Sequence, residues 1–213
     1  MSAEYEGKFA EGKNEVHEGK SAGGDGDDAR PAVEIKTLDS ECNGMWLPLT
    51  SGFDVEIGFT VGEGGGGRVR GARWVVDYRY DAMDATKVLP LLDGGEDGAR
   101  DYDAGEHTFR HKFDDIKLAG VKLKVFKNIM GIVTASLQDK DGEKLVEVNF
   151  VVQTRRTKFA PEGGEGGAAG GGAGAGAGGE VPDESMSHVE RSKKGKFLYV
   201  YERMLIVPDV EES

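Results

Sequence analysis

Two histidines stand at a spacing at which side chains of one element could share a metal ion or a proton. His107 and His111 lie four residues apart in a segment where polar and aromatic residues alternate. In a strand, this spacing places both rings on the face that carries Phe109 and Phe113, but about 13 Å apart. A zinc ion binds its ligands at about 2 Å, so the pair is too far apart to share one. We therefore expect no metal site and no cofactor.

Three other features could do chemistry, and each lacks a necessary part. The carboxylate-rich segment 93–103 lacks the alternating spacing and the final glutamate of a calcium-binding EF-hand loop, so we interpret it as a solvated acidic loop. The glycine run 62–67 has no Lys-Ser or Lys-Thr ending and no helix after it, which a phosphate-binding loop requires. Cys42 has no base beside it in the sequence. The sequence therefore predicts a protein that is not an enzyme.

The composition restricts the possible partners. With 27 Lys and Arg residues against 39 Asp and Glu residues, the 213-residue chain has a formal net charge of −12. Such a charge repels nucleic acid phosphates and attracts basic proteins. We therefore expect a protein partner, either basic and histone-like or cytoskeletal, and no direct contact with nucleic acid.

The cysteine count and the hydropathy bear on the compartment. A single cysteine cannot form an internal disulfide, which favours a reducing, intracellular environment. Residues 1–20 are charged and contain no apolar run, so they do not resemble a signal peptide. No segment approaches the ~20 apolar residues of a membrane span. The sequence predicts an intracellular protein without a membrane span, and it leaves nuclear and cytoplasmic or ciliary locations open.

Alternating apolar and polar residues predict β-strands through the middle of the chain. In the clearest case every second residue from Phe53 to Val61 is apolar, a period of two that is typical of a strand buried on one face. Asp141-Gly142 predicts a hairpin turn. The apolar segments 121–125 and 129–137 are interpreted as one long strand or a bent pair. Further strands are predicted at 33–36, 72–80, 86–91, 107–113, 145–152 and 197–206.

The glycine distribution separates a folded core from flexible segments. The chain has 34 glycines, and residues 166–179 consist only of glycine and alanine, which offer no side chains to bury. About seven to nine short strands without a strong helix predict an all-β, immunoglobulin-like antiparallel sandwich. The predicted parts are a disordered acidic tail at 1–31, a sandwich core at 32–160, a Gly/Ala-rich disordered insertion at 161–190, a C-terminal strand that completes the sandwich at 191–208, and an acidic tail at 209–213.

Four segments resemble the core of the anti-silencing-function (Asf) histone chaperones. They lie between Val33 and Val152 and read VEIKTLDSECNGMWLPLTSGFDVEIGFTV, ARWVVDYRYDA, GEHTFRHKF and GIVTASLQDKDGEKLVEVNFVV. In that family too, a short first strand leads to a Phe-rich alternating strand, a strand with Trp that ends in Tyr, and a long closing hairpin. The resemblance implies an immunoglobulin-like sandwich with an acidic surface that binds the histone H3–H4 dimer.

The resemblance also points to three positions on the closing hairpin. The family binds histone H3 with an aliphatic residue, an arginine and a tyrosine, and the corresponding positions here are Ile132, Glu147 and Val151. Ile132 keeps the residue type of the family, whereas Glu147 reverses the charge that a partner would meet. Prenyl-binding and Rho-inhibitor proteins follow similar strand patterns, so lipid binding stays open as well.

The predicted contact surface is one face of the hairpin 129–152. Its exposed side chains are expected to be Ile132, Thr134, Glu147, Asn149 and Val151. Two basic clusters flank the Gly/Ala segment, the first with Arg155, Arg156 and Lys158, and the second with Arg191, Lys193 and Lys194. These clusters are interpreted either as a docking patch for an anionic partner or a nuclear import signal, or as cations that protect strand edges.

These observations predict a non-enzymatic protein-binding module, either histone-chaperone-like or an adaptor. A partner could also add a strand to a sheet edge. The alternatives are a structural component of a cytoskeletal or ciliary assembly, and a lipid carrier of the prenyl-binding kind. A lipid carrier needs a hollow core between its sheets, so the packing of the core distinguishes it from the others.

Overall fold

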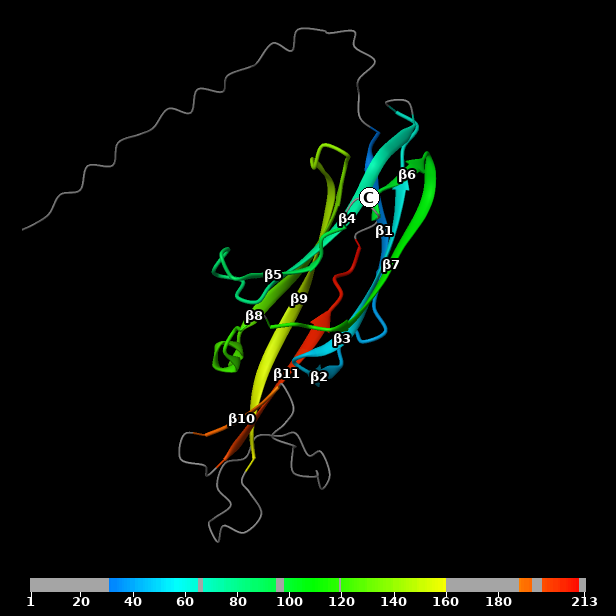
Figure 1. Ribbon diagram of the computed structural model, residues 1–213. Helices are drawn as coiled ribbons and strands as arrows, with labels where there is room; N and C mark the ends of the chain where they lie inside the picture. The colour runs from blue at the N-terminus through cyan, green and yellow to red at the C-terminus, as the bar shows by residue number, and fades with distance from the viewer. Residues whose placement is uncertain are drawn as a thin grey trace, which may run out of the picture.

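The computed structural model describes residues 31–64, 67–94, 98–118, 120–159, 188–192 and 197–210. In these residues the chain forms two antiparallel sheets that pack face to face (Figure 1). The prediction of an all-β antiparallel sandwich is confirmed. The predicted tail at 1–31 lies outside the described residues except for its last position, and the predicted Gly/Ala insertion except for its last three.

The smaller sheet is built around the strand with the clearest alternation. Its strands are β1 (Val33–Asp39), β3 (Ser51–Val61) and β7 (Gly105–Asp115), in the order β1-β3-β7. In β3 the apolar residues from Phe53 to Val61 are buried and the residues between them are half-buried. The central strand therefore directs its apolar side chains to the other sheet and its polar ones outward.

The larger sheet has eight strands, and the β8–β9 hairpin lies at its centre. A hairpin turn joins β8 and β9 where Gly142 has a φ of 81°, a value that glycine adopts without strain. The order is β10 (Val189–Arg191), β11 (Leu198–Ile206), β9 (Lys144–Phe159), β8 (Met130–Gln138), β4 (Arg68–Arg79) and β5 (Val88–Leu92), while β2 (Trp46–Pro48) pairs with β11 and β6 (Arg100–Asp103) with β4.

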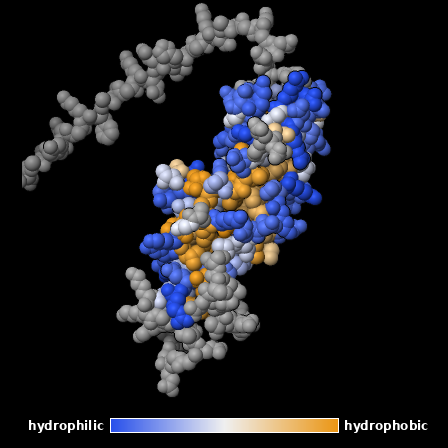
Figure 2. Space-filling model, in the orientation of Figure 1, coloured by the Kyte–Doolittle hydropathy of each residue, from blue (hydrophilic) through white to orange (hydrophobic). Residues whose placement is uncertain are grey.

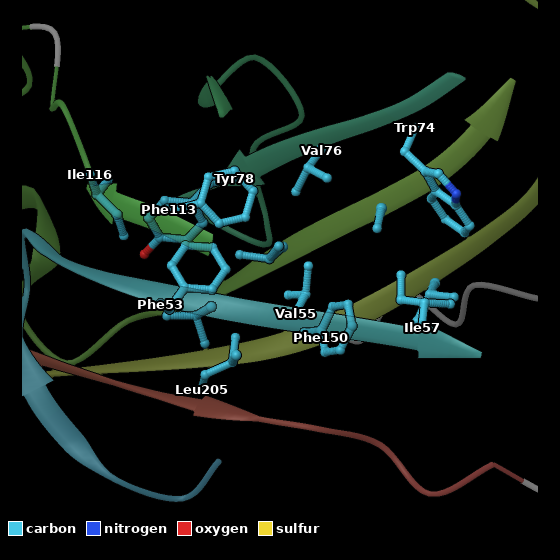
Figure 3. Close-up of a cluster of buried hydrophobic side chains, with 14 of the residues drawn as sticks. Phe53, Val55, Ile57, Trp74, Val76, Tyr78, Phe113, Ile116, Phe150 and Leu205 are labelled. Carbon is cyan, nitrogen blue, oxygen red and sulfur yellow. The ribbon is translucent and has the colours of Figure 1, made fainter. Parts of the chain in front are cut away.

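Large side chains fill the space between the two sheets (Figure 3). Phe53 of β3 stacks on Phe113 of β7 with ring centroids 4.6 Å apart, and Phe59 meets Trp74 of β4 edge to face at 5.6 Å. From the larger sheet, Phe150 is fully buried. Burial of such apolar side chains stabilises the fold by about 1.5–3 kcal/mol each before the loss of conformational entropy.

A buried arginine ties the two sheets together. Arg203 of β11 is only 1% exposed, and its Nη2 donates to the carbonyl oxygens of Ser51 and Gly52 in β3, at 2.7 and 2.9 Å. The guanidinium also lies 5.0 Å from the centre of the Phe53 ring. Burial lowers the pKa of Arg203 from its usual value. The carbonyl contacts fix how β11 of one sheet sits against β3 of the other.

One predicted segment has a different structure. Instead of a strand at 121–125, the chain forms a 3₁₀ helix, η1 (Leu123–Phe126), and β8 begins at Met130. The Phe126 side chain is fully buried, and the hydroxyl of Thr154 donates to its carbonyl oxygen at 2.9 Å. Asn128, with a φ of 53°, then redirects the backbone. Tertiary contacts therefore hold this segment in a short helical turn although its apolar residues alternate as in a strand.

Two short strands lie in segments predicted as connections. β6 falls within the acidic segment 93–103 and pairs with the first half of β4, where Arg68 forms ion pairs of 3.1 Å with Asp101 and Asp103. β10 begins at Val189, at the end of the predicted insertion, and pairs with β11. The strand β6 of this acidic segment is thus held against β4 because two of its carboxylates meet Arg68.

Candidate functional site

The five predicted contact residues come together on the outer face of the larger sheet. In the β8–β9 register, Ile132 pairs with Val151 and Thr134 with Asn149, while Glu147 lies one outward position further along β9. Their sequence neighbours Val133, Phe150 and Val152 are buried between the sheets. Because side chains alternate along a strand, burial of that set directs the five predicted residues outward.

A chain of hydrogen bonds fixes the polar half of this face. The Thr134 hydroxyl donates to Oδ1 of Asn149 at 2.7 Å, and Nδ2 of Asn149 donates to Oε1 of Glu147 at 3.2 Å. Lys144 forms an ion pair with the other oxygen of Glu147. The hydrogen bond from Lys144, followed by that from Asn149, holds the pKa of Glu147 below its usual value. The carboxylate of Glu147 is therefore ionised at neutral pH, and these contacts link the four residues of the polar ladder, which is defined as Thr134, Asn149, Glu147 and Lys144.

Next to the polar ladder lies a band of apolar side chains from four strands. Val151 has Ile132 on one side and Ile206 of β11 on the other. The next row adds Met130, Met204 and Trp46, with Gln153 of β9 between the two methionines. Met130 is 53% exposed, whereas Ile132, Val151 and Ile206 are half-buried. The apolar band is defined as Ile132, Val151, Ile206, Met130, Met204 and Trp46.

Four of the six residues of the apolar band, Ile206, Met130, Met204 and Trp46, were not predicted from the sequence. Trp46 and Met204 come from strands that are 158 positions apart, and only the pairing of β2 with β11 places them side by side. One part of the sequence gave a usable signal for the band. In the run Met204–Leu205–Ile206 the middle residue is buried, which places the other two on the outer face. That pattern predicts that the side chains of Ile206 and Met204 point outward. It does not predict which residues of other strands lie beside them.

A cation and a carboxylate border the apolar band. Arg155 of β9 donates from Nε and Nη2 to the carboxylate of Glu202 on β11, at 2.7 and 3.1 Å. The guanidinium also lies 4.1 Å from the centre of the Trp46 ring. The two hydrogen bonds to Glu202 orient the Arg155 guanidinium. Its contact with the ring holds the Trp46 side chain at the edge of the band.

The predicted basic residues do not form one patch. Arg155 lies on the outer face, whereas Arg156 and Lys158 point to the opposite side of β9 and lie over the rings of Tyr199 and Phe197. Arg191 lies at the end of β10. Lys193 and Lys194 lie outside the described residues. The strand alternation therefore divides the first cluster between two faces.

The outer face of the smaller sheet has a different character. Asp54 and Glu56 of β3 lie beside Arg110 of β7, and Glu56 forms an ion pair with Arg110 at 2.7 Å. Asp54 also accepts from the amide of Glu41 at 3.1 and 3.2 Å. Carboxylates and their partners occupy this face, which is typical of a solvated surface.

The two histidines of β7 take part in aromatic contacts. His107 lies 5.5 Å from the Phe59 ring, and His111 lies 4.5 Å from Phe113. The His107 Nε2 contacts the carbonyl oxygen of Asp103 at 2.7 Å. In the part of the chain that the structure describes, no three His, Cys, Asp or Glu side chains are grouped closely enough to hold a metal ion.

Comparisons with known proteins add no family to this description. No family model matches the sequence, and no curated protein matches it significantly. Among the described residues, no helix is long and apolar enough to cross a membrane. The outer face of the larger sheet, with its apolar band and polar ladder, is the candidate functional site.

Proposed function

We propose that this chain is a non-enzymatic protein-binding module that docks its partner on the outer face of β8 and β9. The apolar band is the observation that carries the proposal. On this face Met130 leaves more than half of its surface exposed, and Ile132, Val151 and Ile206 are half-buried. Apolar surface bordered by polar side chains is typical of protein contact sites, and Figure 2 shows apolar surface gathered over the middle of the molecule between hydrophilic areas.

The chemistry of the face defines the partner. A segment with an apolar stripe would cover Ile132, Val151 and Ile206, and its polar side chains would meet the ladder of Thr134 and Asn149. The chain carries a net charge of −12, which favours a basic partner. A basic amphipathic helix, such as those of core histones, has these properties. The resemblance to the Asf chaperones points in the same direction.

The packed interior favours this proposal over a lipid carrier. Phe53, Phe59, Trp74 and Phe150 occupy the space between the sheets, and each is at most 4% exposed. A prenyl or acyl chain would have to displace several of these rings, at a cost of about 3–5 kcal/mol for each ring removed. A cytoskeletal or ciliary partner would bind the same outer face. Binding experiments with purified proteins distinguish such a partner from a histone.

The test measures binding of purified histone H3–H4 dimer to the full chain by calorimetry at low salt. Ile132→Asp and Val151→Asp each place a charge in the apolar band, and we expect each to weaken binding at least about tenfold because an unpaired carboxylate is then buried in the contact. Thr60→Asp is the matched control, since Thr60 lies on the outer face of the smaller sheet. It is expected to leave the affinity unchanged.

Two results would contradict the proposal. If Thr60→Asp weakens binding as much as Ile132→Asp, charge alone and not the apolar band governs the affinity. If purified tubulin binds with the same dependence on Ile132 while H3–H4 does not bind, the docking face stands but the histone-like partner is wrong. Denaturant unfolding curves of each variant show whether a loss of affinity is caused by a loss of fold stability.

A further inference from the structure

The end of β9 extends beyond the part of the larger sheet that the smaller sheet covers. The pairing of β8 with β9 stops at Gln153, whereas β9 continues to Phe159 and pairs there with β11. β10 adds a third strand at this end (Figure 1). The three strand ends therefore form a small sheet that continues beyond the last residue of β9 paired with β8.

Two cations of β9 lie on aromatic rings along this inner side. The Arg156 guanidinium lies 4.3 Å from the centre of the Tyr199 ring, and the Lys158 ammonium lies 3.5 Å from the centre of the Phe197 ring. The two cations are alternate residues of one strand, which spaces them by about 7 Å. Each ring attracts the cation above it, so the two long side chains are held side by side.

Among the described residues, no carboxylate forms a direct ion pair with Arg156 or Lys158. Arg155, on the opposite side of the strand, forms a two-point ion pair with Glu202. Arg156 and Lys158 have no such ion pair within the described ranges. On this side the Glu190 carboxylate accepts a hydrogen bond from the Tyr201 hydroxyl at 2.9 Å, and Arg156 forms a hydrogen bond with the same tyrosine side chain.

We propose that Arg156 and Lys158 form a docking site for an acidic, extended peptide segment of a protein partner. Alternate side chains of an extended peptide are also about 7 Å apart, so two carboxylates at positions i and i+2 would match the two cations. An acidic peptide fits better than single-stranded nucleic acid. Nucleic acid binding relies on aromatic rings that stack on bases, whereas one face of each ring here is already covered by a cation.

The experiment uses the full chain and a fluorescent peptide of alternating Glu and Ser, with binding followed by anisotropy at low and high salt. The double variant R156Q/K158Q is expected to weaken binding at least about tenfold, and salt is expected to weaken binding to the native chain. The matched control is Arg155→Gln, which removes a cation whose charge Glu202 already balances. It should leave the affinity within about twofold.

Three outcomes would overturn the proposal: equal binding of the peptide by R156Q/K158Q and the native chain, an equal loss in Arg155→Gln, or tighter binding of a single-stranded oligonucleotide than of the peptide. Arg156→Lys keeps the charge and should retain most of the affinity. The site lies on a different side of the sheet from the apolar band, so Ile132→Asp should not affect the peptide. Failure here therefore leaves the proposed function untouched.

Discussion

The outer faces of the two sheets come from strands with the same alternating pattern, yet they carry different side chains. On the smaller sheet, Asp54 and Glu56 alternate with buried residues, and Glu56 is paired with Arg110. On the larger sheet, Ile132 and Val151 occupy the equivalent outward positions. One outer face therefore carries paired charges and the other an apolar band, although both inner faces are apolar.

The difference shows that the composition of the outward positions, and not the alternation itself, carries the functional signal. Alternation reports that one face is buried. The side chains at the outward positions indicate whether water or another molecule contacts the outer face. Apolar side chains at these positions are unexpected for a sheet whose outer face is solvated. Four predictions sharpen this comparison, from the largest expected effect to the smallest.

Truncation of neighbouring residues should separate the inner face from the outer one. Phe150 is fully buried, whereas its neighbour Val151 is half-buried on the outer face. Phe150→Ala is expected to lower the free energy of unfolding by about 3–5 kcal/mol because it leaves a cavity. Val151→Ala should lower it by about 1 kcal/mol or less. Denaturant unfolding measures both, and equal losses would contradict the assignment of the two faces.

The border of the apolar band should contribute strongly to binding and little to folding. Trp46 lies between Arg155 and the row of Met204. Trp46→Ala is expected to weaken partner binding by about 2 kcal/mol, since large aromatic residues dominate such contacts. Calorimetry with the partner checks this. A normal affinity together with a large loss of stability would show that Trp46 has a structural role.

Tyr201 should make stability depend on pH in the alkaline range. Burial, followed by the hydrogen bond to Glu190, raises the pKa of Tyr201 from 10.0 to about 12. The folded state thus keeps the proton that the unfolded state releases, and the resulting stabilisation is complete below pH 10 and is lost as the pH rises to about 12. The loss is on the order of 2 kcal/mol. Unfolding of the native chain and Tyr201→Phe across this range should show that their difference shrinks; a constant difference would contradict the assignment.

Glu147 should produce the smallest effect, at acidic pH. Its hydrogen bonds with Lys144 and Asn149 lower its pKa in the folded state. The stabilisation is therefore present above the ordinary pKa of a glutamate and is lost as the pH falls through the lower, folded value. Because the pair is partly exposed, the loss should stay below about 1 kcal/mol. Glu147→Gln should flatten this part of the stability profile, and an unchanged profile would show that the ladder does not stabilise the fold.

Local sequence patterns predicted the sandwich because burial determines alternation. The segment from Phe53 to Val61 has one buried face, and its strand differs from the prediction by two residues at one end. The strand predicted at 121–125 was wrong because the buried Phe126 and the Thr154 hydroxyl hold the segment in a helical turn despite its alternation. Such tertiary contacts leave no local trace in the sequence.

The candidate site was partly predictable for the same reason. The outward positions of the β8–β9 hairpin follow from parity along two consecutive strands, so Ile132 and Val151 could be named in advance. Trp46 and Arg203 could not, because their contacts join strands that are far apart in the sequence. From the sequence, a charged arginine in a strand is predicted to point outward. Arg203 is buried instead, because two backbone carbonyls accept its hydrogen bonds.

Photo-crosslinking from the two outer faces tests the docking face most directly. A photoreactive residue is placed at position 132 or at position 60, and each chain is irradiated in a lysate with and without excess unmodified chain. The account predicts a crosslinked protein from position 132 that the unmodified chain competes away, and no such product from position 60. The same products from both positions, or products from position 60 alone, would contradict it.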